Sequence, residues 1–227
     1  MKQLVFRLVL ISFCLVAVSG CSHTLTVENM RDFCLASTIE SPGKKIDVGI
    51  KPAIGNYDQI WCYNSIVEKF NSRREIGKFC SNFVDGRSSF KPDYILSLEP
   101  QVKYESSGWN YIVNFPGGII FAPAWHGYTY YVKIATNVAI YSGDGSELKK
   151  FTIDTSYSIR HSEFDRTWYP AFQFCVLNAL GGFYTAFVYD NDITSHVKNV
   201  IKDNYSSYVV GNIMEEIKAF EANKSVR

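Results

Sequence analysis

Alternation of apolar and polar residues marks the middle of the chain as a β-sheet. The clearest pattern runs over residues 128–141, where every second residue is apolar or threonine, and residues 151–159 repeat it. The turn sequence SGDG at Ser142–Gly145 joins them, so the two runs predict a β-hairpin. Residues 93–104 alternate more weakly, and Pro100 predicts that this strand is an edge or carries a bulge.

Helical spacing of apolar residues appears on both sides of this strand-rich region. Residues 57–74 carry an apolar stripe at intervals of three and four, with Asp58 as the expected N-cap. Residues 193–202 and 209–220 predict two further amphipathic helices, parted near the polar residues 204–207. Helices are therefore expected to follow the sheet as well as to precede it.

One segment, residues 170–189, is nearly all apolar and has two interpretations. Its length is enough for a membrane-spanning helix. Gln173, Asn178 and the pair Gly181-Gly182 weaken that interpretation and favour a helix buried against the sheet, with a kink or break at the glycines.

The order of these elements predicts an α+β fold. A short strand at 45–50 precedes the first helix, and the polar residues 21–44 are expected to form a tether with a short helix near 28–37. Residues 45–227 then make a single domain, in which an antiparallel sheet with a central hairpin at about 128–160 is covered by helices on one face.

The N-terminus has the pattern of a secretory signal peptide. Residues 1–20 begin with the positive charges of Lys2 and Arg7, continue with the apolar run 8–18, and end in the small residues that precede Cys21. The sequence Val18-Ser19-Gly20-Cys21 resembles the lipobox of bacterial lipoproteins. Two alternatives are a secretory signal with a chance cysteine and an N-terminal transmembrane anchor.

The resemblance implies cleavage between Gly20 and Cys21 and acylation of Cys21, including palmitate. Several acyl chains on one residue would hold the protein at a membrane, which a single chain does only marginally. Ser22 follows the cysteine, whereas enterobacterial lipoproteins retained in the inner membrane carry aspartate there. The resemblance thus implies a lipid anchor in the outer membrane and a domain that faces the periplasm.

The body of the chain is loosely similar to small α/β lipoproteins that act as accessories of envelope machines for polysaccharide export, curli secretion or cell-wall synthesis. The phrase KPDYIL at Lys91–Leu96 resembles the strand that follows the first helix in such proteins. This similarity implies a non-enzymatic structural or assembly role, with an envelope protein or a second copy of the chain as partner. It implies no catalytic residue.

The charge balance excludes one class of partner. The 23 Lys+Arg and 22 Asp+Glu residues give a net charge of +1, and removal of Lys2 and Arg7 with the signal peptide leaves 21 and 22, a net of −1. A nucleic-acid-binding domain usually carries a strong basic patch. No nucleic-acid partner is therefore expected.

The cysteines divide by their expected fate. Of the six, Cys14 leaves with the signal peptide and Cys21 takes lipid. The four that remain can form up to two disulfides in an oxidising compartment, or can be buried as free thiols; they are Cys34, Cys62, Cys80 and Cys175. Cys62–Cys80 is the first pair to test. No zinc-ligand spacing and no cofactor motif occur, so neither a metal nor a cofactor is expected.

Residues 108–128 are the strongest candidate for a functional surface, because the segment is too apolar for an ordinary exposed loop. It forms a buried connection, a protein-binding patch or self-association surface, or a contact with lipid headgroups. The large apolar side chains of the expected partner loop are Trp109, Phe115, Ile119, Ile120, Phe121 and Trp125.

An enzyme or small-ligand binder is the alternative function. His126 lies in the same segment, and His161 and Asp165 follow the hairpin, with Ser158 or Ser162 as conceivable nucleophiles. The sequence lacks the Gly-x-Ser-x-Gly elbow that would place such a serine. The polar run around His161 is also typical of a solvated strand end.

Overall fold

The computed structural model describes residues 24–33, 45–84, 90–114, 117, 122–162 and 187–225. Several predictions from the sequence lie outside these residues and stay predictions. They concern the signal peptide 1–20, Cys21, Cys34, Cys175, Asp165, most of the segment 170–189, and Phe115, Ile119, Ile120 and Phe121 of the expected partner loop.

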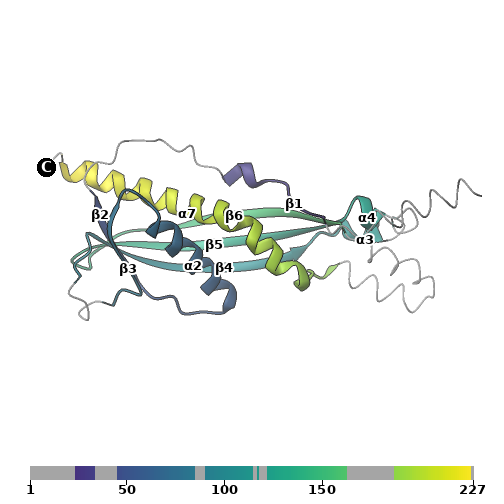
Figure 1. Ribbon diagram of the computed structural model, residues 1–227, viewed down its shortest axis with the longest axis horizontal. Helices are drawn as coiled ribbons and strands as arrows, with labels where there is room; N and C mark the ends of the chain where they lie inside the picture. Colours follow the sequence, from purple (N-terminus) through teal and green to yellow (C-terminus); the bar gives the residue numbers. More distant parts are fainter. Residues whose placement is uncertain are drawn as a thin grey trace, which may run out of the picture. The chain divides into compact units, whose positions relative to one another are not determined.

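The described residues form an α+β fold with a six-stranded sheet in the order β1-β6-β5-β4-β2-β3 (Figure 1). Its strands are β1 (Thr24–Val27), β2 (Ile46–Ile50), β3 (Ile76–Ser81), β4 (Tyr94–Ser106), β5 (Tyr128–Ser142) and β6 (Glu147–Ser162). The helices are η1 (Met30–Phe33), α2 (Tyr57–Asn71), α3 (Asn110–Asn114), α4 (Ala122–Trp125), η3 (Asn191–Ile193) and α7 (Thr194–Ser225). The predicted α+β class is confirmed.

The predicted hairpin is confirmed as β5 and β6. The amide of Ser142 donates to the carbonyl of Ser146 at 2.8 Å and closes the turn. The even-numbered residues of β5 from Tyr128 to Ile140 are buried, as are the odd-numbered residues of β6 from Ile153 to His161. The two-residue period of the sequence therefore identifies the side of the hairpin that enters the core.

The sheet is mixed, whereas the sequence predicted an antiparallel one. β1 pairs antiparallel with β6, but β2 pairs in parallel with both β3 and β4. The physical reason is the connection between β2 and β3: α2 carries the chain back to the end of the sheet at which β2 began. A parallel pair needs such a crossover, and a helix usually supplies it.

Two short strands, β1 and β3, have no counterpart among the predicted elements. β1 lies in the segment expected to be a tether, and β3 lies in a stretch for which the sequence predicts no element. Each has a weak pattern: no residue of β1 is buried, and Ile76 is the only buried residue of β3. Such strands are held by backbone pairing to a stronger neighbour, which leaves little trace in the sequence.

The first helix is confirmed as α2, with a correction at its start. Asn56, and not Asp58, is the N-cap: its side chain accepts from the Gln59 amide at 3.0 Å, and the Gln59 side chain accepts from the Asn56 amide at 2.8 Å. This reciprocal pair is a capping box. Ile60, expected in the apolar stripe, is exposed.

The two predicted C-terminal helices form one continuous helix, α7. The polar residues expected to part them are instead held by tertiary contacts. The Asn204 side chain donates to the Met30 carbonyl at 3.0 Å and accepts from the Tyr157 hydroxyl at 2.9 Å, and Tyr205 shares a 2.8 Å hydrogen bond with Thr136. In the described part of the chain, no helix combines the length and the apolar character needed to cross a membrane.

The chain divides into two compact units by its contacts. Unit 1 takes in residues 1–28, 104–132 and 158–197, and unit 2 takes in residues 29–103, 133–157 and 198–227. β4, β5, β6 and α7 each contribute residues to both units.

Candidate functional site

Unit 1 carries an exposed apolar surface where β4 and β5 are connected. Two short helices, α3 and α4, lie in this connection (Figure 1). Trp109 is 57% exposed and Trp125 is 64% exposed, and three further large apolar side chains are at least 39% exposed. We call this surface the aromatic tip; it consists of Trp109, Ile112, Trp125, Phe187 and Val188.

Asn110 fixes the tip to the sheet, a role that no sequence pattern indicated. Its fully buried side chain accepts from the Thr129 amide at 2.7 Å and donates to the Thr129 carbonyl at 2.8 Å. It also donates to the Ser106 hydroxyl at 3.0 Å. One amide side chain thus joins the end of β4 to the beginning of β5, so that Trp109 is held beside the sheet.

The structure describes two of the six residues of the expected partner loop, and the loop's binding role stays a prediction. Of its described members, Trp109 and Trp125 are both exposed, which argues against a wholly buried connection. The side chains of Val113 and Asn114 in α3 are buried. Tyr111 stacks on Phe187 with ring centroids 6.4 Å apart, and this contact joins α3 to residues far along the chain.

The structure places the two histidines expected for an enzyme site, whereas Asp165 lies outside the described residues. His126 Nδ1 lies 3.0 Å from the carbonyl oxygen of Gly127, its neighbour in sequence. His161 is buried within β6. Ser158, one of the two candidate nucleophiles, donates its hydroxyl to Glu28 at 3.3 Å. Across the described residues, no three His, Cys, Asp or Glu side chains gather as a metal site would require.

Unit 2 contains a cleft of about 560 Å³ at the carboxyl ends of the parallel strands β2 and β3. In sheets with parallel strands, ligands commonly bind at this edge. The cleft is lined by Lys51, Pro52, Ala53, Ile54, Gln59, Phe83, Val84, Ser97, Leu98, Glu99, Pro100 and Gln101. Ile54 is 96% exposed at its rim, and Val84 is also exposed.

One wall of the cleft is the part of β4 that extends beyond β2. The last residue of β4 paired with β2 is Leu96, whose carbonyl also accepts from the Lys51 amide at 2.8 Å. Because backbone groups alternate along a strand, those of Leu98 and Pro100 point to the same side as those of Leu96. Pro100 has no N–H, so an edge position costs it no ladder bond, as the sequence predicted.

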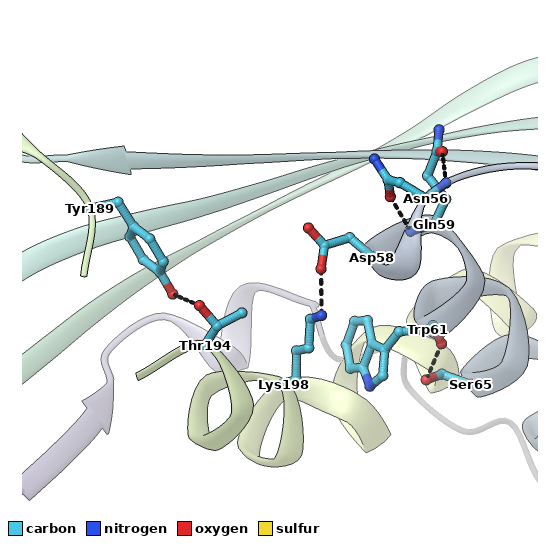
Figure 2. A network of polar contacts seen from close by, with 8 residues as sticks. All are labelled: Asn56, Asp58, Gln59, Trp61, Ser65, Tyr189, Thr194 and Lys198. Atoms are coloured by element: carbon cyan, nitrogen blue, oxygen red, sulfur yellow. Dashed lines mark hydrogen bonds and ion pairs between the residues drawn. The ribbon is translucent and has the colours of Figure 1, made fainter. Parts of the chain in front are cut away.

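A buried lysine joins α2 to α7 (Figure 2). Lys198, at 6% exposure, makes an ion pair with Asp58. Its ammonium also lies 4.3 Å from the centroid of the Tyr57 ring and 5.6 Å from that of Trp61. The carboxylate and the two ring faces together compensate the charge in a desolvated place, and this indicates a structural role.

Cys62 and Cys80, the first pair to test for a disulfide, follow the alternative that the sequence left open. Both thiols are free. Cys62 is buried in α2, where burial raises the pKa of its thiol to about 12, and a hydrogen bond with Tyr205 opposes this only in part. Cys80 lies on β3, with its sulfur 3.6 Å from the carbonyl oxygen of Ser81. The sequence could not show that helix and strand direct these thiols to different surroundings.

Comparisons with known proteins identify no family for this chain. No family model matches the chain, and no curated protein matches it. Among solved structures, a minor lipoprotein from Acinetobacter baumannii is similar, with a TM-score of 0.40 and 7% sequence identity over 77% of this chain and 94% of that one. No family membership follows from this similarity.

Proposed function

We propose that the protein is a lipid-anchored lipoprotein of the bacterial cell envelope with a non-enzymatic, protein-binding role. The anchor is Cys21, sited in the outer membrane, and the folded units face the periplasm. The lipobox at residues 18–21 supports the anchor, and Ser22 supports the outer membrane. The cleft of unit 2 is the surface that receives the partner.

The observation that carries the binding role is the strand edge that forms one wall of the cleft. Along that wall, β4 presents the N–H and C=O of Leu98 and the C=O of Pro100 past the end of β2. An extended peptide can add to such an edge through main-chain hydrogen bonds, while side-chain pockets select its sequence. The exposed Ile54 and Val84 supply apolar contacts at the rim. The occupant we propose is an extended segment of another envelope protein.

Photo-crosslinking in intact cells tests this binding role. A crosslinking amino acid at Ile54 and, separately, at Val84 should capture the same protein. The matched control is Lys150, an exposed residue of β6 that does not line the cleft. The capture at Val84 should fall roughly tenfold or more when Leu98→Pro removes an N–H from this edge, since loss of one hydrogen bond and the accompanying strain cost at least about 1.4 kcal/mol. Because the Leu98 side chain is also buried, Leu98→Ala is the paired variant: it truncates the side chain but keeps the N–H, so it should retain most of the capture. Equal capture from Lys150, or capture unchanged by Leu98→Pro, would contradict the proposal.

The anchor is tested by processing and fractionation. Cys21→Ala should abolish incorporation of labelled palmitate and leave the chain unprocessed or soluble. Ser22→Asp should move the acylated protein to the inner membrane of an enterobacterial host, whereas Ser22→Ala should leave it in the outer membrane. Full processing of Cys21→Ala with unchanged outer-membrane fractionation would refute the anchor.

A further inference from the structure

We infer that the aromatic tip of unit 1 inserts into the headgroup region of the membrane that holds Cys21. The lipid surface is thereby a second contact, which fixes the orientation of unit 1. This inference rests on the proposed acylation of Cys21. The inference does not depend on the cleft. It depends on the position of the tip, which lies at the same end of the unit 1 strands as the start of β1.

The distance from the anchor to the fold is short. Only Ser22 and His23 separate Cys21 from Thr24, the first residue of β1. Even a fully extended chain covers no more than about 11 Å in three residue steps. An acylated Cys21 sits at the membrane surface, so Thr24 is held within about 11 Å of that surface.

Strand pairing carries this proximity to the tip. Thr24 pairs with Ser162, the last residue of β6, at a Cα separation of about 5 Å in an antiparallel ladder. Gly127 lies against the same strand end: a Cβ built on it would stand 2.5 Å from Ser162 Oγ and 2.7 Å from the His161 carbonyl oxygen. Trp125 is two residues away. The tip is therefore at the anchored end of unit 1.

The chemistry of the tip suits a lipid interface. Tryptophan combines a large apolar ring with an N–H donor and is enriched at the headgroup level of membranes. Residues 108–128 contain no Asp, Glu, Lys or Arg, so insertion of this segment desolvates no fixed charge. An exposed apolar surface of this kind needs an occupant, and the membrane is the one that the anchor keeps within reach.

Fluorescence quenching by brominated lipid tests the inference. The full-length acylated protein is reconstituted into vesicles of phosphatidylethanolamine and phosphatidylglycerol that contain dibrominated phosphatidylcholine. Tryptophan emission should be quenched, and the double variant Trp109→Phe with Trp125→Phe should lose about half of that quenching or more, because both exposed tryptophans of the tip are then absent from the lipid. These substitutions keep an aromatic ring, so the fold is preserved.

Trp61→Phe is the matched control, since Trp61 stacks on Tyr205 within unit 2. The quenched fraction of this variant should not fall. Mass spectrometry of the same sample reports acylation. An acylated protein whose quenching is unchanged by the Trp109 and Trp125 substitutions overturns the inference and leaves the proposed function standing, whereas a non-acylated Cys21 refutes the anchor itself. Crosslinks from positions 109 and 125 to another protein, or to a second copy of the chain, in place of lipid would also overturn the inference.

Discussion

Gly127 and Gly145 both have positive φ, at 78° and 87°, but their surroundings differ. A Cβ on Gly145 would meet nothing within 4 Å, because this residue lies in the open turn between β5 and β6. A Cβ on Gly127 would overlap the backbone at the end of β6. A substitution at Gly145 therefore tests backbone strain alone, whereas one at Gly127 tests backbone strain together with steric overlap.

Gly127→Ala should lower the free energy of unfolding by about 2–4 kcal/mol, while Gly145→Ala should lower it by about 1 kcal/mol. Both variants place a side chain in the left-handed region, but only the first must also move the end of β6. Urea denaturation followed by circular dichroism measures both values. Equal losses would show that residue 127 does not lie against β6.

Cys62 and Cys80 allow a second test at the scale of single residues. The pKa of Cys62 is raised to about 12 by burial, so its thiol is protonated at pH 8 and does not react as a thiolate. Cys80 is partly exposed. Iodoacetamide at pH 8 should label Cys80 in the folded protein and label Cys62 only after unfolding, as read by peptide mass spectrometry. A Cys62–Cys80 disulfide recovered from the periplasm would contradict this result.

At the scale of elements, two lysines four residues apart on α7 pair with carboxylates of α2. Lys198 is buried against Asp58, whereas Lys202 reaches Glu68, whose side chain is 70% exposed, at 2.7 Å. The two ion pairs join the same helices but differ in solvation. A buried lysine that loses its partner carries an uncompensated charge, while an exposed one is screened by water.

Asp58→Asn should therefore cost about 3 kcal/mol of folding free energy, and Glu68→Gln less than about 1 kcal/mol. Both changes remove one negative charge from α2 and keep the side chain's size. Thermal and urea denaturation of the two variants under the same buffer conditions compare them. If Glu68→Gln lowered the free energy of unfolding as much as Asp58→Asn, the burial of Lys198 would not be what determines the cost of losing its partner.

The elements that could be predicted are those whose own side chains enter the core. The alternating apolar residues of β5 and β6 and the apolar stripe of α2 can be recognised in the sequence. β1 and β3 were missed because backbone pairing holds them. The continuity of α7 was not predicted, because asparagine is a poor helix former and Asn204 lies in its middle. In the structure, hydrogen bonds with Tyr157 and the Met30 carbonyl hold Asn204 in the helix.

Of the two candidate surfaces, the sequence could suggest the aromatic tip but not the cleft. The exposure of Trp109 and Trp125 fits two of the three interpretations that the sequence left open, because composition cannot tell a buried apolar loop from an exposed one. The cleft could not be predicted at all. It depends on the parallel pairing of β2 with β4 and on where that pairing stops, at Leu96.

At the scale of the whole molecule, the proposed anchor and the tip act together only because the chain between Cys21 and Thr24 is short. A long flexible linker in that place would keep the protein on the membrane but would no longer hold one end of unit 1 against it. The pairing of β1 with β6 is what transmits the position of the anchor to the fold.

Inserting a flexible spacer of Gly and Ser after His23 tests this coupling. A spacer of about twelve residues has a root-mean-square length of about 20 Å, which lowers the local concentration of the tip at the lipid surface. Acylation of Cys21 should persist, while quenching of tryptophan emission by brominated lipid should fall about twofold. The control is the same spacer placed after Gly145, in the turn between β5 and β6, which leaves the Cys21–Thr24 connection unchanged and should preserve the quenching. Unchanged quenching with the spacer after His23 would mean that the tip holds to lipid by its own affinity, and the short connection would then not be what orients unit 1.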